Sequence, residues 1–470
     1  MNASPRNVLI FVADDQTHRS IGCLNNPEVR TPHLDRLVRR GTAFTRAFHQ
    51  GSWAQAVCVP SRAMLHTGRS LYRCGGPTCG DHPLLGETFG AHGYHTYATG
   101  KWHNQDAALG RSFREEQTLS LGMAMSTGFD FEANAPAGDP AQSAYGRPAL
   151  GNVWAADDES RRGHWMPTRE DPGRIEHSST RWADDTIRYL KGRAGSDEPF
   201  LAYCAFHAPH DPRQAPTEFL DMYPVDAVEL PPNYLPEHPF DQGDARVRDE
   251  QLAPWPRTQD VVRTHRREYH AILSHMDAQL GRVLDALDEA GLADQTLVVY
   301  TADHGLAVGE HGLMGKQNLY DHSLGVPLVF AGPGVRPGAR SDALVYQHSV
   351  FATVAELCGV EAPAGLDFPS LAPLLRGGGL GPHETLYGAY RDYQRTCRDR
   401  RHKLILYPHL GRYQLFDTID DPFETHDLAL EADARRRHRG VAQRLAEGLL
   451  AWQEAVGDGL ALDLGAYGWG

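Results

Sequence analysis

The chain has 470 residues, with 46 Lys and Arg against 60 Asp and Glu, which gives a formal net charge of −14 at pH 7. This acidic balance excludes a general nucleic-acid binder, because such proteins present a basic surface. No apolar run reaches the roughly 18 residues that a membrane-spanning helix needs. The first apolar run, Asn7–Val12, is too short for a signal peptide. We therefore expect a cytoplasmic globular protein with neither a nucleic-acid nor a membrane partner.

The predicted elements alternate between strands and helices. Val8–Val12 is a continuous apolar run, typical of a strand buried on both faces. Thr31–Val38 follows as a helix with a capping threonine and a proline in its first turn. In His270–Ala290 apolar residues recur every three or four positions, which predicts a longer helix. Further buried parallel strands are predicted at Phe200–Phe206, Leu297–Thr301 and Val326–Phe330. This alternation predicts an α/β fold with a doubly wound, mostly parallel sheet flanked by helices.

Two long stretches, 104–180 and 208–262, are rich in Gly, Pro, Asp and Arg and have weak periodicity. They form either surface excursions or walls of an active site, and the sequence leaves both interpretations open. A glycine-rich break at Arg376–Pro382 predicts a boundary between domains at 1–376 and 377–470. The second domain is predicted to be a smaller α+β unit with strands at Thr385–Tyr390, His402–Tyr407 and Tyr413–Asp417 and a helix near Asp433–Val456.

Acidic turns follow two of the predicted strands. Asp14 and Asp15 come directly after the first strand, and Asp303 and His304 come after the strand that ends at Thr301. Ligands of open α/β sheets bind outside the carboxyl ends of the strands, where these side chains can converge. Three carboxylates and a histidine form an oxygen-rich site suited to Ca²⁺ or Mg²⁺. We therefore predict a metal site at this edge of the sheet, against the alternative that each aspartate only caps the following segment.

Cys58 stands out among seven cysteines, an odd number that does not suggest a disulfide framework. Cys74 and Cys79 lack the second pair of ligands that a zinc site requires. Pro60 and Gly68 bracket a short predicted helix, so Cys58 lies just before a helix N-terminus, where the dipole stabilises an anion. On these residues alone, Cys58 is either a thiolate nucleophile or an inert buried cysteine.

The segment around this cysteine resembles the signature of the type I sulfatases, which belong to the alkaline phosphatase superfamily. Cys58-Val-Pro-Ser-Arg62 is followed by Thr67-Gly-Arg69, as in the motif in which the cysteine is converted to Cα-formylglycine. The resemblance extends over nearly the whole chain and implies the superfamily's α/β fold. Its other motifs lie at Asn7–Asp15, Thr31–Leu37, Gly100-Lys101-Trp102-His103, Pro209-His210-Asp211-Pro212, Thr301–Gly305, Gly315-Lys316 and Leu415–Pro422.

The resemblance implies a role for each matched residue. The formylglycine at position 58 would share one divalent cation, Ca²⁺ in preference to Mg²⁺, with Asp14, Asp15, Asp303 and His304. Arg62 and Lys101 would hold the hydrated aldehyde, and His103 would deprotonate its second hydroxyl group. His210 and Lys316 would bind the sulfate group, and one of them would protonate the leaving oxygen. A formylglycine-generating maturation enzyme is the partner that this chemistry requires.

The expected activity is hydrolysis of sulfate monoesters, with an aryl or carbohydrate sulfate, a small sulfated molecule or a sulfated oligosaccharide as substrate. One alternative is a phosphonate or phosphate ester hydrolase of the same superfamily, because both substrates are tetrahedral anions. The other is a catalytically silent metal- or carbohydrate-binding homologue. Three residues are further candidates for substrate contact: Asn104, which follows His103, and Arg391 and Arg395, which lie among aromatic residues of the C-terminal domain.

Overall fold

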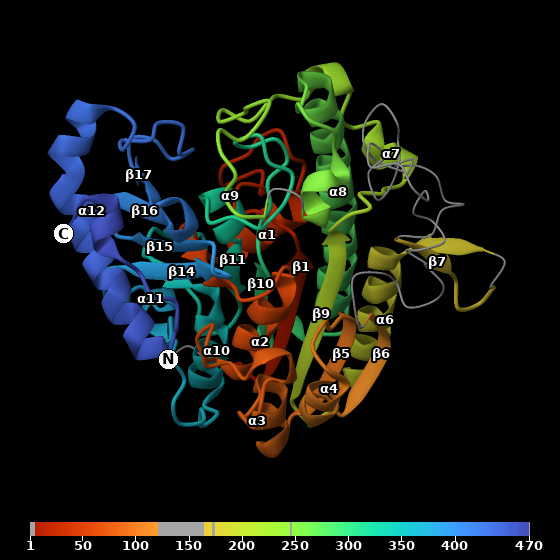
Figure 1. The fold of residues 1–470 in the computed structure, drawn as a ribbon. Helices are drawn as coiled ribbons and strands as arrows, with labels where there is room; N and C mark the ends of the chain where they lie inside the picture. Colours follow the sequence, from red (N-terminus) through yellow and green to blue (C-terminus); the bar gives the residue numbers. More distant parts are fainter. Residues whose placement is uncertain (1–4, 121–163, 172–173, 245–246, 470) are drawn as a thin grey trace.

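The computed structural model describes residues 5–120, 164–171, 174–244 and 247–469 (Figure 1). The middle of the predicted excursion at 104–180 lies outside these ranges. The strands are β1 (Asn7–Asp14), β2 (Gly41–Phe44), β3 (Ala47–Phe48), β4 (Gly51–Ser52), β5 (His95–Lys101), β6 (Glu115–Ser120), β7 (Trp165–Pro167), β8 (Ile175–His177), β9 (Phe200–Pro209), β10 (Thr296–Ala302), β11 (Leu328–Ala331), β12 (Ala339–Ser341), β13 (Val345–Tyr346), β14 (Leu386–Tyr390), β15 (Gln394–Arg398), β16 (His402–Tyr407) and β17 (Arg412–Asp417). The helices are α1 (Pro32–Arg40), α2 (Cys58–Thr67), α3 (Leu85–Ala91), α4 (Asp106–Ser112), α6 (Ser178–Arg193), α7 (Thr217–Leu220), α8 (Gln259–Glu289), α9 (Asp321–Leu324), α10 (Val350–Cys358), α11 (Ala372–Leu375) and α12 (Ala432–Val456).

The main sheet has the strand order β12-β2-β11-β10-β1-β9-β5-β6. β1 lies near its centre, pairs in parallel with β9 and β10, and is buried along its whole length. Strand pairing along β10-β1-β9-β5-β6 is parallel, which confirms the mostly parallel prediction. β11 differs, because it runs antiparallel to both β10 and β2. Its apolar run reflects burial on both faces, and burial alone does not determine direction.

Helices cover both faces of this sheet, as Figure 1 shows. α8 packs against both α1 and α6 on one face, and α2 packs against both α3 and α10 on the other. α8 begins eleven residues before the predicted start at His270, with the Thr258 side chain accepting a hydrogen bond from the Val261 amide at 3.4 Å. None of the helices in the described ranges is long and apolar enough to cross a membrane.

The N-terminus of α1 is capped differently from the prediction. The Thr31 side chain makes no capping bond. Instead, the buried Asp277 carboxylate of α8 accepts hydrogen bonds from the His33 and Leu34 amides at 3.0 and 2.7 Å. A residue more than 240 positions away in the chain therefore accepts the hydrogen bonds of free backbone N–H groups in the first turn of α1.

The C-terminal region forms a five-stranded sheet with the order β17-β16-β15-β14-β4, and α12 packs on it (Figure 1). Its three predicted strands and its helix are present, and β15 is an additional strand. β4 comes from the N-terminal part of the chain, where Gly51 and Ser52 pair in parallel with Ala389 and Tyr390. The boundary at 376/377 stays a prediction, but this sheet is completed by residues from both sides of it.

Candidate active site

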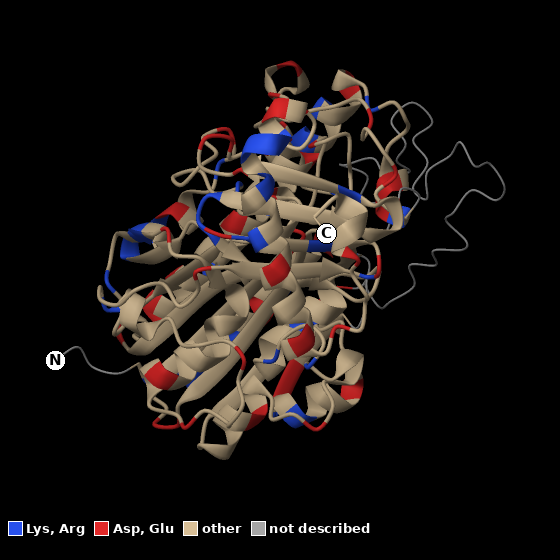
Figure 2. Cartoon of the chain, turned by 60° about the vertical axis from the view of Figure 1, so that its left-hand side comes forward, with Lys and Arg blue, Asp and Glu red and all other residues tan. Residues whose placement is uncertain are grey.

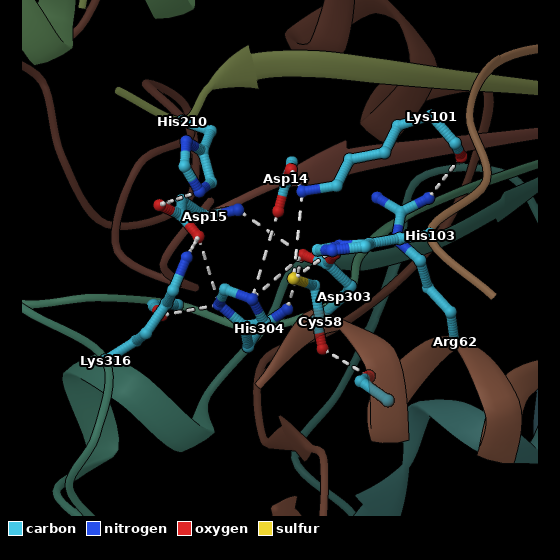
Figure 3. Close-up of polar contacts among 12 residues, drawn as sticks. Asp14, Asp15, Cys58, Arg62, Lys101, His103, His210, Asp303, His304 and Lys316 are labelled. Atoms are coloured by element: carbon cyan, nitrogen blue, oxygen red, sulfur yellow. Dashed lines mark hydrogen bonds and ion pairs between the residues drawn. The ribbon is translucent and has the colours of Figure 1, made fainter. Parts of the chain in front are cut away.

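The site lies at the carboxyl edge of the main sheet (Figure 3). Asp14 ends β1, Lys101 ends β5, and His210 directly follows β9. Asp303 and His304 directly follow β10, and Lys316 comes from the loop after that strand. Cys58 is the first residue of α2, which begins two residues before the predicted start at Pro60. Strand ends far apart in sequence thus bring the predicted residues together, as the parallel sheet requires.

Four of the predicted metal ligands form one compact group. Ligand atoms of Asp14, Cys58, Asp303 and His304 all lie within 4.8 Å of one another, and all four residues are buried. Asp14 Oδ1 and His304 Nε2 have no hydrogen-bond partner within the described part of the chain. Buried oxygen and nitrogen atoms without a partner are costly unless a cation binds them. The donor set therefore fits a divalent cation.

Asp15, the fifth predicted ligand, lies beside this group. Its Oδ1 is 3.3 Å from His304 Nδ1 and accepts a 2.7 Å hydrogen bond from Lys316 Nζ. It has a positive φ of 68°, so the chain turns sharply after β1. Both aspartates thereby reach the same side of the site, which adjacent residues of a regular strand could not do.

Polar groups surround the Cys58 sulfur. His103 Nδ1 lies 2.9 Å and Lys101 Nζ 3.7 Å from Cys58 Sγ. Lys101 Nζ also binds the Asp14 carboxylate. Arg62 donates from Nε to Asp303 Oδ2 at 2.9 Å and from Nη1 to the Lys101 carbonyl at 2.7 Å, and its expected contact with the hydrated aldehyde stays a prediction. These hydrogen bonds from Arg62 hold Asp303 and Lys101 in place, and both of these residues lie next to Cys58.

The two predicted sulfate-binding residues approach Asp15 from the other side. His210 Nε2 lies 3.9 Å from Asp15 Oδ2, while Lys316 Nζ binds Asp15 Oδ1. The imidazole of His210 is fully buried and donates from Nδ1 to the Asp211 carbonyl at 2.7 Å. Its Nε2 has no hydrogen-bond partner in the described ranges.

The charges of the site support one another. Burial raises the pKa of Asp14, but Lys101, His210 and Arg62 outweigh burial and hold that pKa well below its usual range. Burial lowers the pKa of Lys316, but the nearby Asp15 and Asp249 carboxylates raise it by more. The pKa therefore lies well above its usual value, and the ammonium group stays charged. Burial, together with Lys101, lowers the pKa of His103 to about 2. His103 is therefore a neutral imidazole beside Cys58, able to accept a proton.

The three candidate substrate contacts have different surroundings. Asn104 donates to the Val59 carbonyl at 3.2 Å, and its buried Oδ1 has no partner within the described chain. Arg391 is partly exposed at the turn between β14 and β15. Arg395 does not fit its expected role, because it is buried in β15 and binds Asp458 at 2.6 and 2.8 Å. Arg395 is therefore a structural residue of the C-terminal sheet.

The sequence interpretation missed residues that hold the site together. The buried Asp211 forms an ion pair with the partly buried Arg248 next to His210, and Tyr203 accepts a hydrogen bond from Arg62 at 3.1 Å. The available signal was the carboxylate directly after His210 and the charged triplet Arg248-Asp249-Glu250 within a proline-rich stretch. The 208–262 stretch therefore contributes part of the active-site wall.

Comparisons with known proteins agree with this geometry. The Sulfatase family model matches residues 6–360, and a model of the N-sulphoglucosamine sulphohydrolase C-terminal region matches 309–454. Human iduronate 2-sulfatase is 29% identical over 412 residues, which cover 77% of this chain and 71% of that protein.

Two solved structures share the fold. One was solved in complex with its substrate D-glucosamine-2-N,6-O-disulfate and has a TM-score of 0.72 at 19% identity, covering 97% of this chain and 99% of the other. The phosphonate monoester hydrolase of Agrobacterium radiobacter has a TM-score of 0.74 at 22% identity, covering 96% of each chain. With a family model matched over most of its length and the family's motif residues gathered in one site, this chain belongs to the sulfatase family of the alkaline phosphatase superfamily and is a sulfuric ester hydrolase.

Proposed function

We propose that this protein hydrolyses sulfate monoesters of carbohydrates or other small molecules through a Cα-formylglycine formed from Cys58. The observation that carries this proposal is the position of Cys58. Its sulfur atom lies within 4.8 Å of ligand atoms of three predicted metal ligands, and also 2.9 Å from His103. An oxygen nucleophile at this position would contact both the cation and a proton acceptor.

Asp14, Asp15, Asp303 and His304 would hold the cation, with Ca²⁺ preferred over Mg²⁺ because Ca²⁺ accepts many protein ligands whereas Mg²⁺ usually keeps several of its waters. A bound cation supplies positive charge against the oxygens of the sulfate group. The hydrated aldehyde supplies two hydroxyl groups, one to attack sulfur and one to release the sulfate afterwards. A formylglycine-generating enzyme is the partner needed to produce it from Cys58.

The remaining steps belong to residues of the chain. Lys101 lies beside position 58 and stabilises an anionic oxygen there. His103 is neutral and takes the proton of the second hydroxyl group. Lys316 and His210, which both lie beside Asp15, would bind the sulfate oxygens, and one of them would donate a proton to the leaving oxygen. Each positioned proton transfer typically contributes about 10²–10⁴-fold to the rate.

The substrate class is supported by the relatives. Iduronate 2-sulfatase carries a sugar sulfate in its name, and a structural relative was solved with a sulfated glucosamine. The likeness to a phosphonate monoester hydrolase favours phosphonate or phosphate ester hydrolysis as the second candidate. Turnover of an aryl sulfate and an aryl phosphonate at equal concentration separates the two, and a preference for the phosphonate would reverse our choice. A silent homologue would turn over neither.

The nucleophile is tested by replacing Cys58. Peptide mass spectrometry of the wild-type protein should show the aldehyde at position 58 in a fraction of molecules. Cys58→Ala should lower sulfatase activity by at least ~10³-fold, because the covalent nucleophile is lost. Cys397→Ala is the matched control, since Cys397 is equally buried but lies in the C-terminal sheet. Activity retained in Cys58→Ala would refute the mechanism.

A further inference from the structure

A cavity of about 240 Å³ lies apart from the candidate active site. Its wall is formed by residues of α8, of α9, of the loop after β10 and of the loop after β17. The described residues that line it include none of the candidate active-site residues. Asn25, Pro27 and Glu229 belong to the wall and are exposed, so the cavity opens to solvent. A small molecule can therefore enter it.

Buried polar side chains of this wall have atoms without a hydrogen-bond partner in the described ranges. These atoms are Thr17 Oγ1, Asn233 Oδ1, Arg266 Nε, His270 Nδ1 and both ring nitrogens of His322. Asn233, His270 and His322 are each more than nine-tenths buried. A buried polar atom without a partner is costly, so a water molecule or a ligand normally supplies one. Their concentration in one cavity indicates a polar occupant.

The unpartnered atoms include both donors and acceptors. The Arg266 Nε–H group donates, Asn233 Oδ1 accepts, and the Thr17 hydroxyl group can do both. Burial lowers the pKa of His270 and of His322 well below the usual value, so both rings are neutral. A neutral imidazole offers one donor and one acceptor. Hydroxyl groups also donate and accept, so a molecule with several hydroxyl groups matches this wall.

The charges around the cavity balance one another. Its shielded carboxylates belong to Glu28, Glu310, Asp321 and Glu424. Arg266 lies 3.7 Å from the first and 3.1 Å from the second, and Lys403 lies 2.6 Å from each of the other two. Arg398 adds a second ion pair to Asp321 at 2.8 Å, and Arg19 lines the wall as the fourth cation. Because these charges are matched, burial of a charged ligand here would be costly, and an uncharged ligand is favoured.

The remaining wall is apolar and includes Leu230, Leu306, Val308 and the Phe423 ring. The cavity is smaller than the roughly 300 Å³ at which pockets for drug-sized ligands begin, which suits a single sugar ring. We propose that this cavity is a binding site for one uncharged sugar ring. Its hydroxyl groups bind Asn233, His270 and His322, and its C–H groups pack against the apolar side chains. This inference does not depend on the proposed function, because the cavity lies apart from the candidate active site.

The test measures the binding of sugars of similar size to the full chain by isothermal titration calorimetry. The uncharged probes are D-glucose, D-galactose and D-mannose, and the charged probes are D-glucosamine, with an ammonium group, and D-glucuronate, with a carboxylate. At least one uncharged sugar should bind at least ~10-fold more tightly than either charged sugar, because the cavity offers no unmatched counter-charge. Failure of all three uncharged sugars to bind would show that the cavity holds water alone and would overturn the proposal.

Two substitutions assign the binding to this cavity. His322→Phe keeps the shape of the ring but removes both nitrogen atoms, so it should weaken binding of the uncharged sugar at least ~10-fold. His270→Phe should do the same from another part of the wall, and it replaces the first variant if that one fails to fold. His348→Phe is the matched control, because His348 is buried and its Nδ1 has no partner in the described chain, but it does not line the cavity. It should bind the sugar as the wild type does.

Binding at the wild-type level in both His322→Phe and His270→Phe would place the sugar elsewhere and overturn the proposal. Tighter binding of a charged sugar than of every uncharged one would overturn it as well. None of these measurements uses turnover of a sulfate ester. The proposed function is therefore tested separately, and either can fail without the other.

Discussion

Arg391 is the candidate for recognising the substrate beyond its sulfate group. Its backbone amide donates to the Ser52 carbonyl at 2.7 Å, six residues before Cys58. Its guanidinium lies over the Tyr393 ring and 3.3 Å from Asp244 Oδ2, with 35% of the side chain exposed. Arg391→Ala should therefore raise KM for a carbohydrate sulfate about 10-fold while sparing 4-nitrophenyl sulfate, which is too small to reach it.

The control for Arg391 is Arg401→Ala, which removes another partly exposed arginine of the C-terminal sheet that pairs with carboxylates. This variant should behave like the wild type on both substrates. Steady-state kinetics on the two esters provide the measurement. Loss on both esters in Arg391→Ala, or on neither, would make Arg391 a structural residue as well.

Single residues differ in how far the sequence predicts them. Cys58, Lys101 and His103 were found because their motifs encode chemistry at fixed spacing. Arg248 and Asp211 meet only through the fold, 37 positions apart, so no local spacing marks them. Arg391 and Arg395 are four residues apart in one aromatic-rich segment, and only the position of each along the hairpin separates an exposed side chain from a buried one.

Among the elements, α1 and α8 are joined by the buried Asp277 carboxylate. Burial raises the pKa of Asp277 to about 7, although the His33 and Leu34 amides act to lower it. In the unfolded chain an aspartate has a pKa near 3.9. The folded state therefore binds a proton at Asp277 more tightly than the unfolded state does. The free energy of unfolding that this protonation contributes is lost as the pH rises through 7. Asp277→Asn removes this dependence, so from pH 5 to pH 8 the variant should gain about 3 kcal/mol in free energy of unfolding relative to the wild type.

Denaturant unfolding of both proteins at several pH values measures this difference. Asp285→Asn is the control on the same helix, because Asp285 is half-exposed and pairs with Arg36 at the surface. Its unfolding free energy should follow the wild-type pH dependence. Parallel curves for the wild type and Asp277→Asn would show that this carboxylate is ionised in the folded protein at all these pH values.

The elements themselves were predicted where one physical signal dominates. β1, β9 and β10 are buried on both faces, so their apolar runs are unambiguous. The direction of β11 and the two-residue strand β4 were missed, because β11 also pairs with the distant β2 and β4 pairs with the distant β14. The cap of α1 was misassigned for the same reason, since a local threonine signal competed with a carboxylate on another helix.

At the scale of the whole molecule, the candidate metal site joins the centre of the main sheet to α2. A cation that binds only the folded state stabilises it by about 4 kcal/mol at 1,000 times its Kd. Removal of divalent ions with EDTA should therefore lower Tm and abolish activity, and Ca²⁺ should restore both. Asp14→Asn should be insensitive to EDTA at the same concentrations. An unchanged wild-type Tm on chelation would contradict a resident cation.

The charge distribution of the whole molecule agrees with a substrate bound in a local pocket. Lys and Arg are interspersed with Asp and Glu over the face in Figure 2, and the net charge is −14. A long polysulfated chain would be repelled by this acidic balance except at the site. The cationic groups of the site, Arg62, Lys101 and Lys316, are instead buried.

The burial of α2 has a consequence for the order of events in biosynthesis. Cys58, Ser61 and Arg62 are 0–1% exposed, so an enzyme that reads this motif cannot reach it in the folded chain. β4, just upstream, pairs with β14, which lies more than 330 residues later in the chain. If Cys58 is converted as we propose, the converting enzyme would therefore act while the C-terminal half is still being synthesised or is unfolded. Slower folding would then increase the fraction of molecules that carry the aldehyde, and a host that folds this chain quickly would leave more of it as thiol.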